Sequence, residues 1–71
     1  RRTFIVTKKI RTLRQSPDVK SGAIAGLQVG VVGRILNCAS GSSWCQIETE
    51  GLRGWLRRVD FWGVYRHEVV K

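Results

Sequence analysis

The stretch Cys38-Ala39-Ser40-Gly41-Ser42-Ser43-Trp44-Cys45-Gln46-Ile47, followed by Gly54-Trp55-Leu56, decides the fold of this chain of 71 residues. A Gly-Ser pair between two arms that each carry a cysteine predicts a β-hairpin with a two-residue turn at Gly41-Ser42. This register places Cys38 opposite Cys45 and Leu36 opposite Ile47. Leu36, Cys38, Cys45 and Ile47 then share the core face, whereas Trp44 lies on the outer face. One conflict remains: Ile35 falls on the polar face and Arg34 on the core face.

The segments around this hairpin also predict strands. Thr3–Thr7 is rich in β-branched residues, and Ile10–Arg14 alternates apolar and polar side chains. We expect further strands at Val31–Cys38, with Gly33 at a bulge or bend, at Arg53–Arg57, and at Phe61–Tyr65, where the chain returns to the first strand. Turn-forming residues dominate 15–22, which predicts a loop, and 58–60 predicts a tight turn or one turn of 3₁₀ helix. The predicted fold class is all-β, a single domain of about five short antiparallel strands in a closed or nearly closed sheet.

The two cysteines predict a disulfide. Opposed residues of a hairpin lie about 4.5 Å apart at Cα when they form a non-hydrogen-bonded pair, which is within disulfide reach. Such a staple suits a domain with a thin core, and an even cysteine count fits an oxidising compartment. The alternative is a pair of reduced, buried thiols. We expect no metal site, because His67 is the one histidine and lies far along the chain.

The charge of the protein indicates which kinds of binding partner are favoured. Thirteen Lys and Arg residues against five Asp and Glu residues make the protein basic, with a formal charge of +8. This charge favours anionic partners: nucleic acid, anionic lipid or acidic cell-wall material. The alternative is a solvated basic surface without a specific partner. No apolar run approaches the roughly 20 residues of a transmembrane helix, so we expect no transmembrane segment in this chain.

Enzyme chemistry has little support in the sequence. Glu48 and Glu50 are the nearest pair of carboxylates, and such a pair on one strand is typical of a solvated face. The serines of the hairpin turn have no base to activate them. No glycine-rich phosphate loop precedes a helix. We therefore expect neither catalysis nor a cofactor.

Four short motifs carry a family resemblance. They are Leu13-Arg14-Gln15-Ser16-Pro17, Leu27-x-x-Gly30, Trp44-Cys45-Gln46-Ile47 and Gly54-Trp55-Leu56. In this order and spacing they resemble the bacterial SH3-like (SH3b) domain over about Thr7 to Tyr65. The Cys-x6-Cys hairpin and the tail Phe61-Trp62-Gly63-Val64-Tyr65 resemble a subgroup found in exported proteins of Gram-negative bacteria.

The resemblance implies a five-stranded SH3-like barrel that binds without catalysing. Members of the family act as cell-envelope modules that recognise peptidoglycan or a protein partner. The implied groove lies between the 15–22 loop and the hairpin of Trp44. The expected ligand-groove residues are Trp44, Pro17, Trp55, Arg57 and Arg58. Arg57 and Asp60 stand where proline-peptide-binding members have Pro and Tyr, so we do not expect recognition of PxxP peptides.

The compartment and the parent protein follow from the same resemblance. We expect one domain over 1–71, with a core at about 7–65, inside a longer exported, periplasmic protein whose signal peptide lies outside this chain. A tandem SH3 copy is an expected neighbour. Two alternatives remain open: a nucleic-acid-binding SH3-like barrel that uses the basic surface, and a structural domain that packs against the tandem copy.

Overall fold

The computed structural model describes residues 2–64, 69 and 70. Over these residues the chain forms seven strands and one 3₁₀ turn, β1 (Arg2–Val6), β2 (Arg11–Arg14), β3 (Ala23–Leu27), β4 (Val32–Asn37), β5 (Trp44–Thr49), β6 (Leu52–Arg57), η1 (Arg58–Asp60) and β7 (Phe61–Trp62). All strand pairs are antiparallel, and the order in the sheet is β3-β2-β6-β5-β4-β1-β7. The expected all-β class and the 3₁₀ turn at 58–60 are confirmed.

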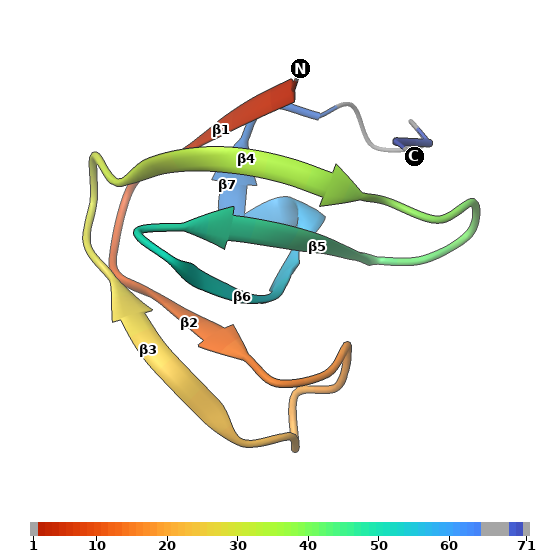
Figure 1. The fold of residues 1–71 in the computed structure, drawn as a ribbon, viewed down its shortest axis with the longest axis horizontal. Coiled ribbons are helices and arrows are strands. Elements are labelled where there is room, and N and C mark those ends of the chain that lie inside the picture. Colours follow the sequence, from red (N-terminus) through yellow and green to blue (C-terminus); the bar gives the residue numbers. More distant parts are fainter. Residues whose placement is uncertain (1, 65–68, 71) are drawn as a thin grey trace.

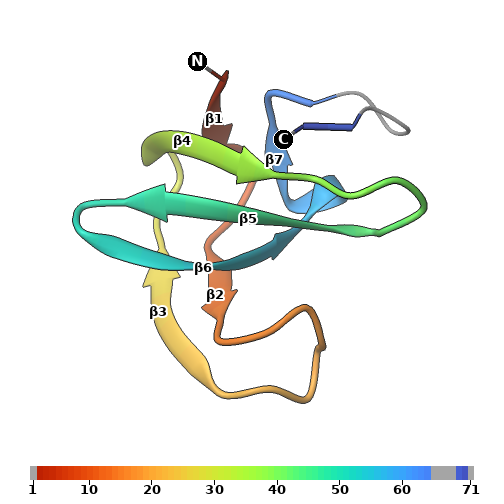
Figure 2. The ribbon, with the colours of Figure 1, turned by 45° about the vertical axis from the view of Figure 1, so that its right-hand side comes forward.

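The sheet curls around one core like an SH3-like barrel. Strands β4, β5 and β6 run across the view of Figure 2, and β1, β2, β3 and β7 cross them (Figures 1 and 2). About five strands were expected, and the described residues form seven. Strands β1 and β7, from opposite ends of the chain, pair with each other as expected and extend the sheet beyond β4. The sheet is not closed, since β3 and β7 are its two edges.

The predicted final strand is confirmed in part. Phe61 and Trp62 pair with Val6 and Ile5 of β1. Tyr65, at the expected end of this strand, lies outside the described residues, as does His67. Further along, Val70 exchanges two backbone hydrogen bonds with Cys38, at 2.7 and 3.0 Å.

The core is aliphatic, with two phenylalanines and the cysteine pair. Its buried apolar members are Phe4, Val6, Leu13, Leu27, Ile35, Cys38, Cys45, Ile47, Leu56, Phe61 and Val70. The rings of Phe4 and Phe61 meet edge to face, with centroids 5.4 Å apart. None of the three tryptophans belongs to this core, since Trp44 and Trp55 are half-buried and Trp62 is 73% exposed. The two phenylalanines meet in this interior because their strands, β1 and β7, are paired.

The register of the β4–β5 hairpin agrees with the prediction near the cysteines and departs from it further down. Asn37 pairs with Gln46, as predicted, but Ile35 and not Leu36 pairs with Ile47. The ladder shifts by one residue between Ile35 and Asn37, which makes Leu36 a β-bulge. This bulge resolves the conflict noted above, because it turns Ile35 into the core.

Two expected details of this region are wrong. The hairpin turn is centred on Ser40-Gly41, with Ser42 N donating to Ala39 O at 3.2 Å. Gly41 has φ +75°, as the third residue of a type II turn requires. Gly33 was expected at a bulge or bend, and the bulge is wrong because Gly33 lies in regular pairing opposite Phe4. It is a glycine because an added Cβ would lie 2.7 Å from the Phe4 ring and would also strike the Glu48 carbonyl.

Candidate ligand-binding site

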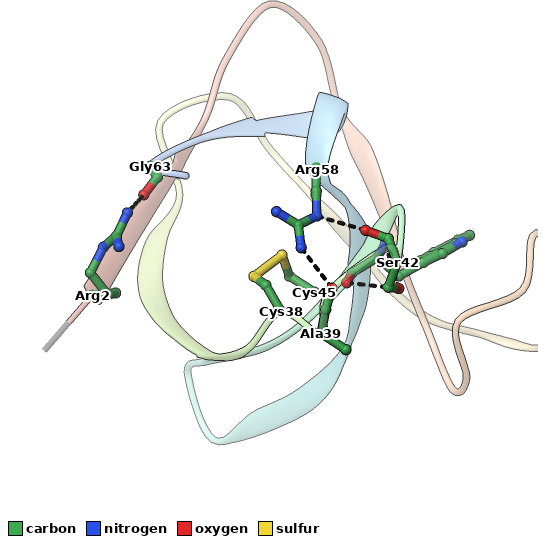
Figure 3. Close-up of a disulfide and its surroundings, with 8 residues drawn as sticks. Arg2, Cys38, Ala39, Ser42, Cys45, Arg58 and Gly63 are labelled. Carbon is green, nitrogen blue, oxygen red and sulfur yellow. Dashed lines mark hydrogen bonds between the residues drawn. A yellow bond between two sulfur atoms is a disulfide. The ribbon is translucent and has the colours of Figure 1, made fainter. Parts of the chain in front are cut away.

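A disulfide and a buried arginine hold the hairpin loop beside the site. Cys38 and Cys45 are bonded, with Cα atoms 4.4 Å apart, and both are fully buried. Arg58 is 8% exposed and donates from Nε to the Ser42 carbonyl at 2.7 Å and from Nη2 to the Ala39 carbonyl at 2.9 Å (Figure 3). Loop carbonyls without strand partners thus accept charge-assisted hydrogen bonds. The loop enters β5 in a defined conformation as a result.

Trp44 is the first residue of β5 and belongs to its outer face. The β5 side chains alternate, with Cys45, Ile47 and Thr49 buried and those between them half-buried. The Trp44 backbone N–H donates to the Ser42 hydroxyl at 3.1 Å, which orients the start of the strand. Across the sheet Trp44 pairs with Arg57 of β6. The predicted outward position of this indole agrees with the strand alternation.

A pocket of about 220 Å³ adjoins Trp44. It is lined by Lys9, Ile10, Arg11, Thr12, Arg14, Val19, Trp44, Arg57 and Asp60. The segment before and within β2 forms one wall, and the β5–β6 pair with η1 forms another. Val19 comes from the 15–22 loop, which lies on the same side of the molecule as the tip of the β4–β5 hairpin (Figures 1 and 2).

Asp60 lies within this cationic pocket and is almost fully buried. Its Oδ1 accepts from Arg11 Nη1 at 3.1 Å, and its Oδ2 accepts from Arg57 Nε at 3.3 Å. Arg57 Nη2 also donates to Oδ1, at 3.3 Å. The Arg11 side chain is 14% exposed, whereas that of Arg57 is 47% exposed. Arg11 is therefore part of the scaffold, and Arg57 is accessible from solvent.

The structure brings two of the five expected groove residues into this pocket. Trp44 and Arg57 line it, whereas Pro17 lies exposed in the loop that contributes Val19. Trp55 is half-buried on the outer face of β6, beside the pocket, because it pairs with Arg14 of β2. Arg58 supports the hairpin loop from inside, as described above.

Sequence reasoning missed Arg11 and Asp60 as partners in this pocket. Arg11 and Asp60 are 49 positions apart, and no local pattern links them. One signal was available for Arg11. It shares a strand face with buried Leu13, two positions on, and an arginine on the core side of a strand needs a carboxylate.

A second cavity of about 150 Å³ lies near exposed Trp62. Arg2, Gly63 and Val64 complete its lining. Arg2 Nη2 donates to the Gly63 carbonyl at 2.6 Å (Figure 3). Among the described residues, this lining has one cationic side chain, already hydrogen-bonded, and the pocket at Trp44 is the stronger candidate for a ligand.

Neither a membrane-spanning helix nor a metal-binding cluster is found in the described part of the chain. No helix there is long and apolar enough to cross a membrane. No group of three or more His, Cys, Asp or Glu side chains there is placed to hold a metal ion.

A comparison of the chain with models of known protein families gave one match that covers most of the chain. The family model described as bacterial SH3 domain matches residues 7–63. The chain therefore belongs to the bacterial SH3 domain family and is a small binding module. The matched range starts before β2 and ends after β7, so it includes all the residues of the Trp44 pocket. No curated protein and no solved structure matched the chain.

Proposed function

We propose that this chain is a noncatalytic binding module of the bacterial cell envelope that recognises peptidoglycan or a protein partner. The observation that carries the proposal is the pocket at Trp44. It combines a partly accessible indole with arginine and lysine side chains. An indole face stacks on sugars and peptide groups, and cations attract carboxylates. Both kinds of group occur in peptidoglycan.

The disulfide supports the compartment in this proposal. Disulfides persist in oxidising environments such as the periplasm and are rare in the cytosol. A disulfide in a bacterial SH3 domain fits an exported protein. We infer that the module acts in the periplasm, where it meets the cell wall.

The noncatalytic part of the proposal rests on how the reactive side chains are used. The Ser42 hydroxyl accepts from the backbone N–H of Trp44 and donates to its carbonyl. Glu48 forms ion pairs with Arg34 at 2.9 Å and with Arg53 at 3.5 Å on the outer face of the sheet. These are the contacts of loop and surface residues, and they give no support to nucleophilic or acid–base chemistry.

Cosedimentation with purified peptidoglycan tests the proposal. We expect the protein to sediment with peptidoglycan at low salt, and we expect Trp44→Ala to lose most of the bound fraction. Trp62→Ala is the matched control, because Trp62 is an exposed tryptophan outside the pocket. Failure of the unmodified protein to sediment above background would contradict the peptidoglycan proposal. Equal loss in both variants would contradict the assignment to Trp44.

Nucleic acid is the second anionic polymer that the basic charge favours. The disulfide argues against it, since exported proteins seldom meet nucleic acid. A titration with a single-stranded oligonucleotide at several salt concentrations separates the two ligands. Nucleic-acid binding would weaken steeply and log-linearly with salt as counterions are released. Tight oligonucleotide binding with this dependence, and no binding to peptidoglycan, would favour the alternative.

A further inference from the structure

Within the described part of the chain, the lining of the pocket at Trp44 carries more positive charge than its one carboxylate can neutralise. Its charged lining residues are Lys9, Arg11, Arg14, Arg57 and Asp60. This described lining therefore carries four cationic side chains and one anionic side chain. A concave surface with excess charge of one sign raises the local concentration of ligands of the opposite sign. The charge of the pocket thus favours an anionic ligand, and the size and shape of the pocket determine which anionic groups fit.

Asp60 already shows how this pocket holds a carboxylate. Its two oxygens accept from Arg11 and Arg57, and the bonds to Arg57 are 3.3 Å long. A well-made bond between a guanidinium and a carboxylate is about 2.7–2.9 Å long. Since the Arg57 side chain is also 47% exposed, its pair with Asp60 is a weak one. Arg57 is therefore positioned by Asp60 while it can still bind a second carboxylate.

Arg11 adds a further sign that Asp60 does not satisfy both guanidinium groups. Arg11 Nε is buried, and within the described part of the chain it has no hydrogen-bond acceptor. A buried donor without an acceptor is costly, and an entering oxygen atom or an ordered water would relieve this cost.

The uncharged part of the described lining is small and mixed. It consists of Thr12, Trp44, and the apolar residues Ile10 and Val19, which are 53% and 54% exposed. The volume of about 220 Å³ lies below the roughly 300–1,000 Å³ of a pocket for a drug-sized ligand. This space suits one carboxylate and a small side chain next to it. It therefore suits the end of a peptide better than the middle of a polymer.

We propose that this pocket binds the free C-terminal carboxylate of a short peptide, with the carboxylate at Arg57 and the terminal side chain against Trp44. The inference rests on the proposed binding function and specifies its ligand chemistry. Two sources supply this group, the stem peptides of peptidoglycan and the C-terminus of a protein. They differ in the configuration of the terminal residue, which is D in mature stem peptides and L in proteins.

Four synthetic peptides test the inference against the whole domain. They are acetyl-Lys-D-Ala-D-Ala, the same sequence in L residues, and the C-terminal amide of each. Binding is followed by NMR at the indole N–H of Trp44. We expect a free acid to bind about tenfold more tightly than its amide, a factor that corresponds to about 1.4 kcal/mol. Arg57→Gln should abolish this preference for the acid.

Arg53→Gln is the matched control, because it removes the same charge from the same strand outside the pocket. It should keep the preference for the acid. Tighter binding of the D acid assigns peptidoglycan as the source, and tighter binding of the L acid assigns a protein. Equal affinity for acids and amides in the unmodified protein would overturn the inference, whatever Arg57→Gln does to folding.

The two proposals fail in different ways. If peptidoglycan does not sediment the protein but the L acid binds, the cell-wall function fails and the pocket chemistry stands. If peptidoglycan sediments the protein but amides bind as well as acids, the cell-wall function stands and the carboxylate site fails.

Discussion

Reduction of the Cys38–Cys45 disulfide should lower the stability of this domain by a predictable amount. The bond joins residues seven positions apart, so it closes a small loop. On the chain-entropy model a loop of this length stabilises the fold by about 2.5 kcal/mol. A chain of this size has a total stability of roughly 4–10 kcal/mol. The staple therefore accounts for a large fraction of the stability.

The corresponding change in melting temperature is large enough to measure easily. For a domain of 60–100 residues, 1 kcal/mol corresponds to about 4–8 °C. We thus expect Tm to fall by about 10–20 °C on reduction. Both cysteines are fully buried, so the bond should be reduced in denaturant and the protein refolded with the reductant present. Thermal unfolding is then followed by circular dichroism, with thiol labelling to verify reduction.

The double variant Cys38→Ala/Cys45→Ala is the control for effects of the reductant itself. Its Tm should be the same with and without reductant. A change of less than about 2 °C in the reduced wild-type protein would refute the reasoning. It would mean that Arg58 and the adjoining strands hold the hairpin arms together equally well without the covalent link, and that the link contributes little.

Three substitutions test the other supports of the site, each by urea unfolding. Arg58→Met removes charge-assisted hydrogen bonds to two loop carbonyls and should lower the free energy of unfolding by about 2–3 kcal/mol. Arg53→Met is its control: this side chain is 61% exposed, so the free energy of unfolding should change by less than about 0.5 kcal/mol. Gly54→Ala would place a Cβ 2.7 Å from a β2 carbonyl oxygen, so we expect a loss of about 1–3 kcal/mol; unchanged stability would show that β2 and β6 separate freely. Asp60→Asn leaves Arg11 buried without its counter-charge and should cost about 3 kcal/mol; a neutral result would argue that this ion pair only balances its desolvation.

The hairpin shows how far local pattern predicts this fold. The cysteine spacing and the alternation of β5 were enough to predict the disulfide, the buried face of Cys45 and Ile47, and the outward position of Trp44. The register beyond Asn37 was wrong because the pattern of one strand cannot indicate a bulge in its partner. The predicted register placed Ile35 on the polar face, and this conflict was the sign in the sequence that a bulge lies next to Ile35.

The pocket was predicted less well than the fold. Trp44 and Arg57 were expected in a groove, and they lie together because their strands pair. Arg58 was expected beside Arg57 in the same groove. Alternation along β6 places Leu56 inside and Arg57 outside, and one residue further on the same alternation turns Arg58 inward, to the carbonyls of the hairpin loop. The two adjacent arginines thus have different roles, since Arg57 lines the pocket and Arg58 supports the hairpin loop. Amino-acid composition alone cannot distinguish these roles.

The amino-acid sequence by itself determined the all-β class, the staple and the family, because each depends on residues close together in the chain or on motifs in a fixed order. The tertiary structure alone decided the ion pairs of Asp60 with Arg11 and Arg57 and the extent of the pocket around them. Those features depend on distances between segments that are far apart in the chain. Such distances are set only when the sheet curls around its core and brings η1 beside β2.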